Sequence, residues 1–419
     1  MKKKSHRNRV PASAPRKSKP SVPLARIKVI GVGGGGGNAV SRMSRNFIRG
    51  VEFVAINTDH QDLDHCGVRR RVYIGKNLTR GLGTGMNPDL GRQAAEENRA
   101  EIAEAVKDTD LVFIAAGLGG GTGTGVSPVV AEAAKQSGAL TLAFVTKPFA
   151  FEGSQRQRIA EEGLMKLKDK VDVMIVVPND RIFTIISKDT SLVKAFEAID
   201  DVLKRALEGL VELIVTPGII NLDFADVRSV IQDAGTAVVG VGIAGGQDRA
   251  VRAVDLALHS PLLEVNPEGA RGVLLGISGK DLKMTEINEA AKLVSQTVDP
   301  GARIIFGAYY DRHLKPGQLK VTVIATGING QMSATSLFGG FSRERKESFS
   351  PSLKPAFPSE KNASRADLAD RRERGEEGKE SGEASAENQS GAEKGIKPKA
   401  AKTDADVWDI PTFLRRKKR

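Results

Sequence analysis

Residues 117–125 combine glycine and threonine, two residue types well suited to contacting phosphate groups. The stretch reads GLGGGTGTG and follows a short apolar run, residues 111–116, which predicts a buried strand. Ser127 and Pro128 are typical of the N-cap and first turn of a helix, so the glycines lie between a strand and a helix N-terminus. Glycines let backbone N–H groups approach phosphate oxygens closely, and the helix dipole favours an anion. We therefore predict a phosphate-binding loop, with a merely tight turn as the alternative.

Two further glycine-rich segments follow the same pattern. Residues 27–32 predict a strand that runs into a glycine loop, residues 33–37, and then into a helix. From Gly31 this segment satisfies the dinucleotide-binding pattern G-x-G-x-x-G. Residues 81–85, GLGTG, precede another predicted helix. Alternating strands, glycine loops and helices predict an α/β fold with a doubly wound parallel sheet, which binds ligands at the carboxyl ends of its strands.

A long amphipathic helix is predicted over residues 191–214, because apolar side chains recur alternately four and three residues apart. Asn221, Asp223 and Asp226 follow it closely, on a loop that begins the next predicted helix. Such carboxylates could orient a water molecule for phosphoryl transfer, but Asp is also a favoured N-cap, and both interpretations stay open. At 1.5 Å per residue the helix places these acids about 33 Å from the glycine segments. A head-to-tail neighbour, rather than the same molecule, would bring them together.

Charge is concentrated at the two ends of the chain. The formal net charge is +12, yet the first 26 residues carry nine Lys or Arg and the last five residues are all basic, so the body between them is close to neutral. This distribution predicts no specific nucleic-acid binding, although the basic ends could contact anionic surfaces. Cys66 is the single cysteine, which excludes an intrachain disulfide and favours a reducing compartment. Because no apolar run reaches the ~20 residues of a membrane span, we expect a soluble, cytoplasmic protein without a transmembrane segment.

Composition divides the chain into six parts. Pro, Ser and Lys dominate residues 1–25, and mixed charges with few aromatics fill residues 333–404, so both segments are predicted to be disordered. Residues 405–419 regain an apolar group with the single Trp, which is typical of a peptide that folds onto a partner. Between these segments we expect a nucleotide-binding domain, the central helix and a smaller α/β domain, over residues 26–190, 191–214 and 215–332.

Taken together and in this order, the motifs resemble those of the tubulin/FtsZ family of GTPases. The resemblance rests on GGGTGTG, GGGGGNAV, NTD, TKPFAFEG, VPND and NLDFADV within residues 26–330, and on DIPTFLR near the end. It implies a Rossmann-like, doubly wound GTP-binding domain, a long central helix and a smaller C-terminal α/β activation domain. The implied cofactors are GTP or GDP and Mg²⁺.

The resemblance also implies a role for each matching residue. The phosphates and the nucleoside would be held by Gly34, Gly35, Gly36, Gly37, Asn38, Gly121, Thr122 and Gly123. The ribose and phosphate would contact Glu152 and Arg156, and guanine would contact Asn179 and Asp200. The catalytic group would be a synergy loop, which activates water at the GTP of the next subunit and is formed by Asn221, Asp223 and Asp226.

The same resemblance implies a cell-division protein. Head-to-tail filaments would form a division ring at midcell, on the inner face of the membrane, and GTP hydrolysis would depend on polymerisation. Residues 405–419 would bind membrane-tethering and regulatory division proteins. Two other functions stay open. One is a nicotinamide-dependent oxidoreductase, which would give no role to GGGTGTG or to the distant Asp pair; the other is a nucleotide-binding scaffold that polymerises with little turnover.

Overall fold

The computed structural model of the chain describes residues 25–328, apart from residues 46–49, 188, 217, 261–264 and 266. The predicted linker and C-terminal peptide, residues 333–419, lie outside the described residues, as does the predicted basic arm up to residue 24. Ala25 is described, and its side chain is buried in the hydrophobic core.

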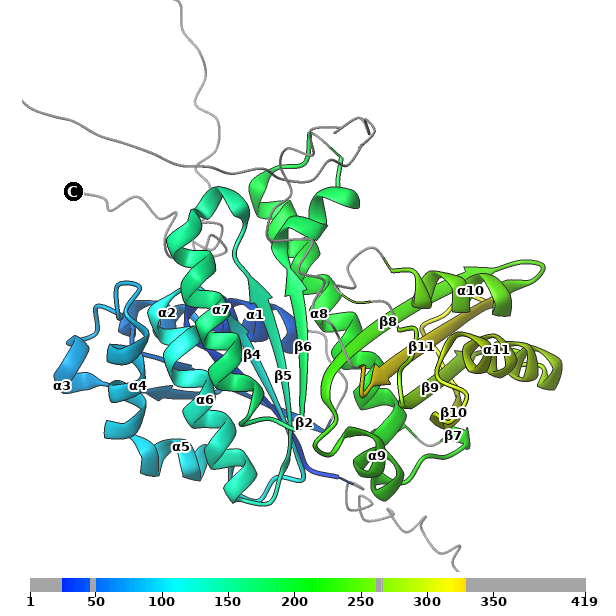
Figure 1. The fold of residues 1–419 in the computed structure, drawn as a ribbon, viewed down its shortest axis with the longest axis horizontal. Coiled ribbons are helices and arrows are strands. Elements are labelled where there is room, and N and C mark those ends of the chain that lie inside the picture. Colours follow the sequence, from blue (N-terminus) through cyan, green and yellow to red (C-terminus); the bar gives the residue numbers. More distant parts are fainter. Residues whose placement is uncertain are drawn as a thin grey trace, which may run out of the picture. The chain divides into compact units, whose positions relative to one another are not determined.

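The N-terminal part of the sheet consists of parallel strands (Figure 1). Across the sheet, the described strands follow the order β3 (Arg70–Tyr73), β2 (Val51–Asn57), β1 (Ile27–Val32), β4 (Leu111–Gly117), β5 (Leu140–Lys147) and β6 (Val173–Pro178). Neighbouring strands β1 and β4 are paired from Ile27↔Leu111 to Val32↔Ala116, so both glycine segments leave the sheet at the same edge. The strands predicted at residues 27–32 and 111–116 are confirmed as β1 and β4, whereas β3 was not predicted.

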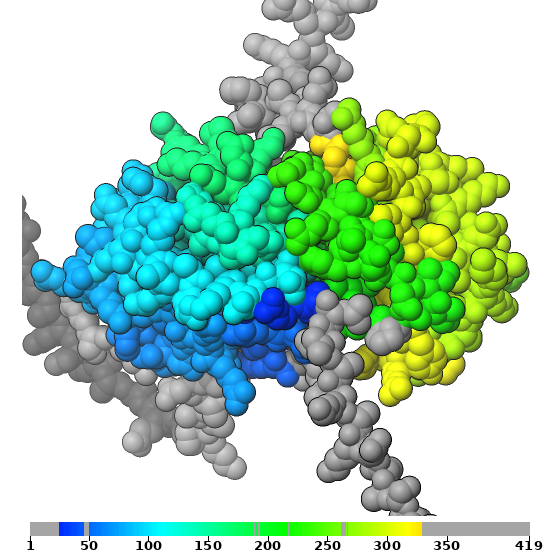
Figure 2. Space-filling model, turned by 90° about the horizontal axis from the view of Figure 1, so that it is seen from below, coloured from blue at the N-terminus to red at the C-terminus, as the bar shows by residue number. Residues whose placement is uncertain are grey.

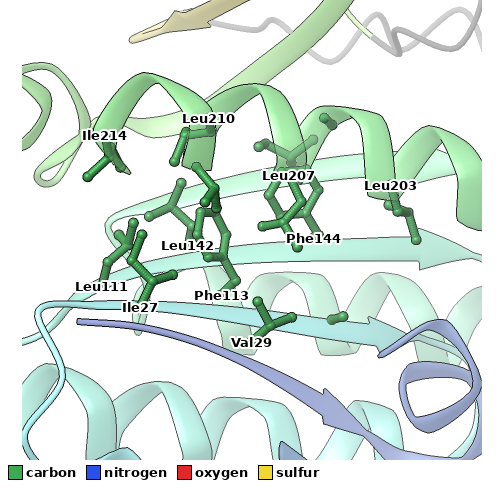
Figure 3. Close-up of a cluster of buried hydrophobic side chains, with 14 of the residues drawn as sticks. Ile27, Val29, Leu111, Phe113, Leu142, Phe144, Leu203, Leu207, Leu210 and Ile214 are labelled. Atoms are coloured by element: carbon green, nitrogen blue, oxygen red, sulfur yellow. The ribbon is translucent and has the colours of Figure 1, made fainter. Parts of the chain in front are cut away.

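Helices cover both faces of these strands. On β1, Ile27 and Val29 belong to the apolar cluster that contacts α8 (Leu192–Val215), as Figure 3 shows, whereas Ile30 and Val32 belong to the cluster under α6 (Gly121–Gln136). Burial on both faces explains the continuous apolar runs in the sequence and confirms the doubly wound fold. The other helices of this part are α1 (Gly33–Ser44), α2 (His60–His65), α3 (Lys76–Thr79), α4 (Pro88–Glu97), α5 (Arg99–Val106), α7 (Ser154–Lys168), and the 3-10 helices η1 (Ala150–Glu152) and η2 (Asn179–Thr184).

The predicted central helix is α8, which lies between the two parts of the sheet (Figure 1). It begins after Ser191, whose side chain accepts a hydrogen bond from the backbone N–H of Lys194 at 3.5 Å, as an N-cap does. Its buried face includes Leu203, Leu207, Leu210 and Ile214, which contact the aromatic and aliphatic side chains of β4 and β5 (Figure 3). The amphipathic pattern of the sequence is therefore used to hold α8 against the sheet.

The C-terminal part adds further strands to the same sheet in the order β8 (Gly235–Gly245), β11 (Gln318–Thr326), β9 (Gly272–Gly279), β10 (Arg303–Tyr310) and β7 (Gly218–Ile220). Strand β11 is antiparallel to both β8 and β9. One face packs on α10 (Arg249–Leu258) and α11 (Met284–Thr297), and the other faces α8 and α9 (Phe224–Ile231). In Figure 2 the surface of these green and yellow elements adjoins that of the blue and cyan N-terminal elements. The smaller α/β domain is thus present.

Two predicted glycine loops are in fact the first turns of helices. Helix α1 begins at Gly33 and α6 at Gly121, six residues before the predicted N-cap, Ser127. The Ser127 hydroxyl donates a hydrogen bond to the carbonyl oxygen of Gly123 at 2.6 Å inside the helix, so it is not a cap. Pro128 is likewise inside α6 rather than in its first turn. Tertiary contacts override the low helix propensity of glycine here, because a Cβ on Gly36, Gly121 or Gly123 would strike neighbouring atoms.

Candidate functional site

A pocket of about 370 Å³ lies at the carboxyl edge of the N-terminal strands. In Figure 1 the arrows of β5 and β6 point to this edge. The N-termini of α1 and α6, residues 82–86, and the first half of α8 surround the pocket. The predicted nucleotide-contacting residues that line it are Gly34, Gly35, Gly36, Asn38, Gly121, Thr122, Gly123, Glu152, Arg156, Asn179 and Asp200. Gly37 does not line the pocket, and its carbonyl oxygen accepts a weak hydrogen bond from Sγ of Cys66 at 3.4 Å.

Two helix N-termini meet at one end of the pocket. The N-cap residues of α1 and α6 are Val32 and Gly120, and neither supplies a side-chain cap. Neither helix has an acidic residue in its first turn. Gly33 has a φ of +70°, and a Cβ built there would lie 2.9 Å from the backbone nitrogen of Gly123. The two N-termini are therefore in glycine-to-glycine contact, and their uncapped N–H groups can bind one anionic group.

Three threonine hydroxyls form a buried group beside these N-termini. Oγ1 of Thr122, in the first turn of α6, lies 2.7 Å from Oγ1 of Thr58 and 3.0 Å from Oγ1 of Thr84. Both Thr122 and Thr84 line the pocket. The sequence prediction named Thr122, and Thr58 within NTD, but it did not predict the hydroxyl contacts that join Thr122 to Thr58 and Thr84. The strand end NTD and the segment GLGTG, which carry them, are distant in sequence and become neighbours only through the sheet topology.

Glu152 and Arg156 form an ion pair on one wall of the pocket. Nη1 of Arg156 lies 2.6 Å from Oε2 of Glu152, and their side chains are mostly buried. The other carboxylate oxygen of Glu152 accepts a hydrogen bond from the backbone N–H of Phe149 at 2.9 Å. Arg158, two residues further, pairs with Glu162 on the surface of α7 and does not line the pocket. The pair at the pocket is thus held in place by η1 and α7.

The other end of the pocket carries buried polar atoms without partners among the described residues. These atoms are Nδ2 of Asn38, Nε and Nη1 of Arg42, and Oδ1 of Asn179. A guanidinium nitrogen of Arg42 also forms an ion pair with Asp200 of α8. Because buried polar groups are nearly always hydrogen-bonded, this end of the pocket fits a ligand with both donors and acceptors. Sequence reasoning missed Arg42, although it follows Asn38 by four residues and therefore shares its helix face.

The predicted synergy loop does not reach this pocket. Asn221, Asp223 and Asp226 are exposed and follow the far end of α8, whose 24 residues span about 36 Å. Oδ1 of Asp223 accepts a hydrogen bond from the backbone N–H of Asp226 at 2.7 Å, so Asp223 is the N-cap of α9. Oδ1 of Asn221 accepts one from the backbone N–H of Gly218 at 2.6 Å. The Asp226 carboxylate has no hydrogen-bond partner among the described residues.

The described part of the chain has neither a cluster of metal-binding side chains nor a helix that could span a membrane. There, no three or more His, Cys, Asp or Glu side chains are grouped as a metal site would require. Asp59 and Asp62 do line the pocket. Within residues 25–328, as far as they are described, no helix is both long and apolar enough to span a bilayer.

Comparison with known proteins gives two matching family models. Residues 26–187 match the GTPase domain of the Tubulin/FtsZ family, and residues 235–329 match the C-terminal domain of the FtsZ family. An empty FtsZ dimer from M. jannaschii is 46% identical, with a TM-score of 0.69 over 73% of this chain and 89% of the other. A mutant FtsZ from M. jannaschii is 47% identical, with a TM-score of 0.68 over 72% and 91%. A GTPγS-bound protofilament of CetZ2 from Haloferax volcanii, at 24% identity and a TM-score of 0.62 over 72% and 92%, shares the fold.

Proposed function

This chain belongs to the tubulin/FtsZ family of GTPases, and we propose that it binds GTP, hydrolyses it and polymerises head to tail. One observation carries the proposal: a single pocket has two uncapped helix N-termini at one end and unpartnered buried polar atoms at the other. The first end suits phosphates and the second suits a polar base. A nucleotide satisfies both ends at once.

The base end favours guanine over adenine. Guanine presents O6 and N7 as acceptors, and its N1–H and amino group as donors. The carboxylate of Asp200 and Oδ1 of Asn179 can accept from those donors, whereas Asn38 and Arg42 supply N–H groups for the acceptors. Adenine presents an unprotonated N1 where a carboxylate needs a donor. Arg42 therefore joins Asn179 and Asp200 in the proposed base site.

The phosphate end uses backbone groups rather than a lysine. Gly34, Gly35 and Gly36 of α1 and Gly121 and Gly123 of α6 line the pocket, and the N–H groups in the first turn of a helix have no partner within the helix. Arg156 adds positive charge from the wall of the pocket, and Glu152 orients it. Mg²⁺ usually retains several waters and binds through phosphate oxygens and one or two carboxylates. The pocket's acidic residues fit that arrangement, so we include Mg²⁺ as a cofactor that neutralises phosphate charge.

Catalysis is assigned to a neighbouring subunit. Each carboxylate that lines the pocket makes a contact within its own chain: Glu152 pairs with Arg156 and Asp200 with Arg42, Asp59 accepts from the backbone N–H of Asp62, and Asp62 accepts from Nδ2 of Asn57. By contrast, Asp226 is exposed at the opposite end of α8 and is free to orient a water molecule at another subunit's GTP. We therefore keep Asn221, Asp223 and Asp226 as the proposed synergy loop.

Exposed apolar side chains at both ends support the head-to-tail contact. Leu82 lines the pocket rim and is 83% exposed, and Ile219 lies two residues before Asn221 and is 71% exposed. Large exposed apolar side chains at two different surfaces fit a heterologous interface, which repeats without closing. We propose that the resulting filaments form a division ring at midcell, and that residues 405–419 bind membrane-tethering and regulatory division proteins.

Complementation between two inactive variants tests the shared site. Asn179→Ala removes a pocket contact, and Asp226→Ala removes a loop carboxylate, so each variant alone should hydrolyse GTP slowly. In an equal mixture, about a quarter of the junctions combine an intact pocket with an intact loop, and about that fraction of the original rate should return. The control mixes Asn179→Ala with a variant that carries both Asn179→Ala and Asp226→Ala. No subunit in this mixture has an intact pocket, so no junction is complete. If the mixture hydrolyses GTP no faster than the two variants do when measured separately, the result contradicts the shared site.

A further inference from the structure

The hydroxyl group of Thr122 has two neighbours but only one proton to donate. Its Oγ1 lies 2.7 Å from that of Thr58 and 3.0 Å from that of Thr84. All three side chains are at least nine-tenths buried. Each hydroxyl can donate once and accept twice, so the direction of each hydrogen bond follows from which acceptors are within reach.

Thr58 must donate to Thr122. Its side chain is completely buried, and among the described residues Oγ1 of Thr122 is the hydrogen-bond partner of its hydroxyl. A Thr58 proton turned elsewhere would be unsatisfied, at a cost that folded proteins avoid. Thr122 therefore accepts from Thr58, and its own proton is left for either Thr84 or a ligand in the pocket.

Thr84 is placed to adapt to either arrangement. Its hydroxyl belongs to residues 80–86, where Arg80 and Met86 have φ values of +51° and +66°. Gly121 makes room for it, because a Cβ there would strike Oγ1 of Thr84 and would lie 2.7 Å from the backbone nitrogen of Asn87. When the pocket holds no acceptor, Thr122 donates to Thr84. When a phosphate oxygen takes the Thr122 proton, Thr84 can rotate its hydroxyl and donate to Thr122 instead.

We propose that Thr84 is a positioning residue for phosphate binding, acting through the hydroxyl of Thr122. The inference rests on the proposed function, because it requires a nucleotide phosphate in this pocket. With both neighbours donating to it, the O–H bond of Thr122 is more strongly polarised, so its proton is more positive and donates more strongly to an anion, as in other cooperative hydrogen-bond chains. In the open pocket a water molecule can replace Thr84, but a bound phosphate displaces that water. Loss of the Thr84 hydroxyl therefore weakens the ligand-bound state more than the free state.

The test measures guanosine, GDP and GTP binding to the full chain, at concentrations too low for assembly. Thr84→Val keeps the shape of the side chain and removes the hydroxyl, Thr84→Ala is a second hydroxyl-free variant, and Thr84→Ser restores the hydroxyl. Thr84→Val and Thr84→Ala should raise the dissociation constants of GDP and GTP about fivefold, since one hydrogen bond is lost. Guanosine affinity should not change, and Thr84→Ser should bind all three ligands as the unaltered chain does.

Three results would overturn the inference: an equal loss for guanosine, a loss in Thr84→Ser as large as in Thr84→Val, or unchanged GDP and GTP binding in the hydroxyl-free variants. The first two would assign Thr84 a structural role in its loop, and the third would assign it none in binding. If the unaltered chain binds neither GDP nor GTP, the proposed function fails, and the premise of this inference fails with it.

Discussion

Nζ of Lys320 lies 2.6 Å from Oε2 of Glu212, and this buried ion pair joins β11 to α8. The Tyr309 hydroxyl donates to the same carboxylate oxygen at 2.8 Å, and Oδ2 of Asp311 lies 3.0 Å from Nζ of Lys320. The first half of α8 lines the nucleotide-sized pocket through Asp200. One helix therefore contacts the pocket at one end and is held to the C-terminal strands by charged hydrogen bonds at the other.

Lys320→Met should lower the free energy of unfolding by about 2–4 kcal/mol, because it leaves buried carboxylates without their cation. The Lys320 and Glu212 side chains are only 13% and 15% exposed, so solvent replaces little of the lost interaction. Urea denaturation measures the change. Lys107→Met is the matched control, since Lys107 pairs with Glu104 at 3.4 Å on the exposed surface, and it should change stability by less than about 0.5 kcal/mol. Equal effects of the two variants would contradict the importance of the buried pair.

Asp172 should make unfolding depend on pH in the acid range. Burial raises the pKa of its carboxyl, but hydrogen bonds from the backbone N–H and hydroxyl of Thr141, together with the charge of Lys135, outweigh burial and lower the pKa. Because the folded pKa lies below the unfolded value of about 3.9, the stabilisation is complete above that value and is lost as the pH falls through the folded pKa. Asp172→Asn should therefore destabilise the chain at pH 7 and by a smaller amount at pH 3. A constant difference in unfolding free energy across this range would refute the assignment.

Two adjacent glycines should respond in opposite ways to alanine. A Cβ on Gly36 would strike the carbonyl oxygen of Ala115 and lie 3.1 Å from the carbonyl carbon of Gly31, so α1 must move away from the sheet. Gly36→Ala should cost about 1–3 kcal/mol and weaken GDP binding. Gly37 has no atom within 4 Å of its Cβ position, and Gly37→Ala should stabilise α1 by about 0.5–1 kcal/mol. Thermal unfolding and GDP titration of the two variants measure these effects. Similar losses of stability in Gly36→Ala and Gly37→Ala would contradict the packing described for Gly36.

Asp223 allows helix capping and catalysis to be separated. In Asp223→Asn the amide oxygen can still accept from the N–H of residue 226, so stability should stay within about 0.5 kcal/mol while the charge is lost. If the carboxylate orients water in the neighbouring site, GTP turnover at high protein concentration should fall about a hundredfold. GTP binding should be unaffected, because the residue is far from the pocket. Normal turnover in Asp223→Asn would leave Asp223 with its capping role only.

Much of the fold could be predicted from local pattern. Strand β1 and helix α8 were predicted within a residue or two, because each is a strongly apolar or strongly periodic segment with clear boundaries. By contrast, β3 is a four-residue strand, RRVY, whose charged residues give no strand signal, and it forms only because β2 is beside it. The predicted start of α6 was wrong because helix propensity does not take account of tertiary packing, and close packing holds Gly121 and Gly123 in the helix.

The site was predictable where motifs stand at strand ends. Asn179 and the glycines of α6 line one pocket because their strands, β6 and β4, run parallel on either side of β5 and end at the same edge of the sheet. Arg42 and Thr84 were missed, since their roles arise from an ion pair with α8 and a hydroxyl contact with α6 that no local pattern encodes. The roles of Asn221, Asp223 and Asp226 stay a prediction, because the partner they would act on is another molecule.

The rate of GTP hydrolysis per subunit, measured with Mg²⁺ over a wide range of protein concentrations, tests the central claim most directly. If the site is completed by the loop of a neighbour, the rate per subunit is close to zero below a threshold concentration and rises above it as subunits associate. A rate per subunit that stays constant at all concentrations would place every catalytic group within one molecule. That result would contradict the assignment of Asp223 and Asp226 to the active site of an adjacent subunit.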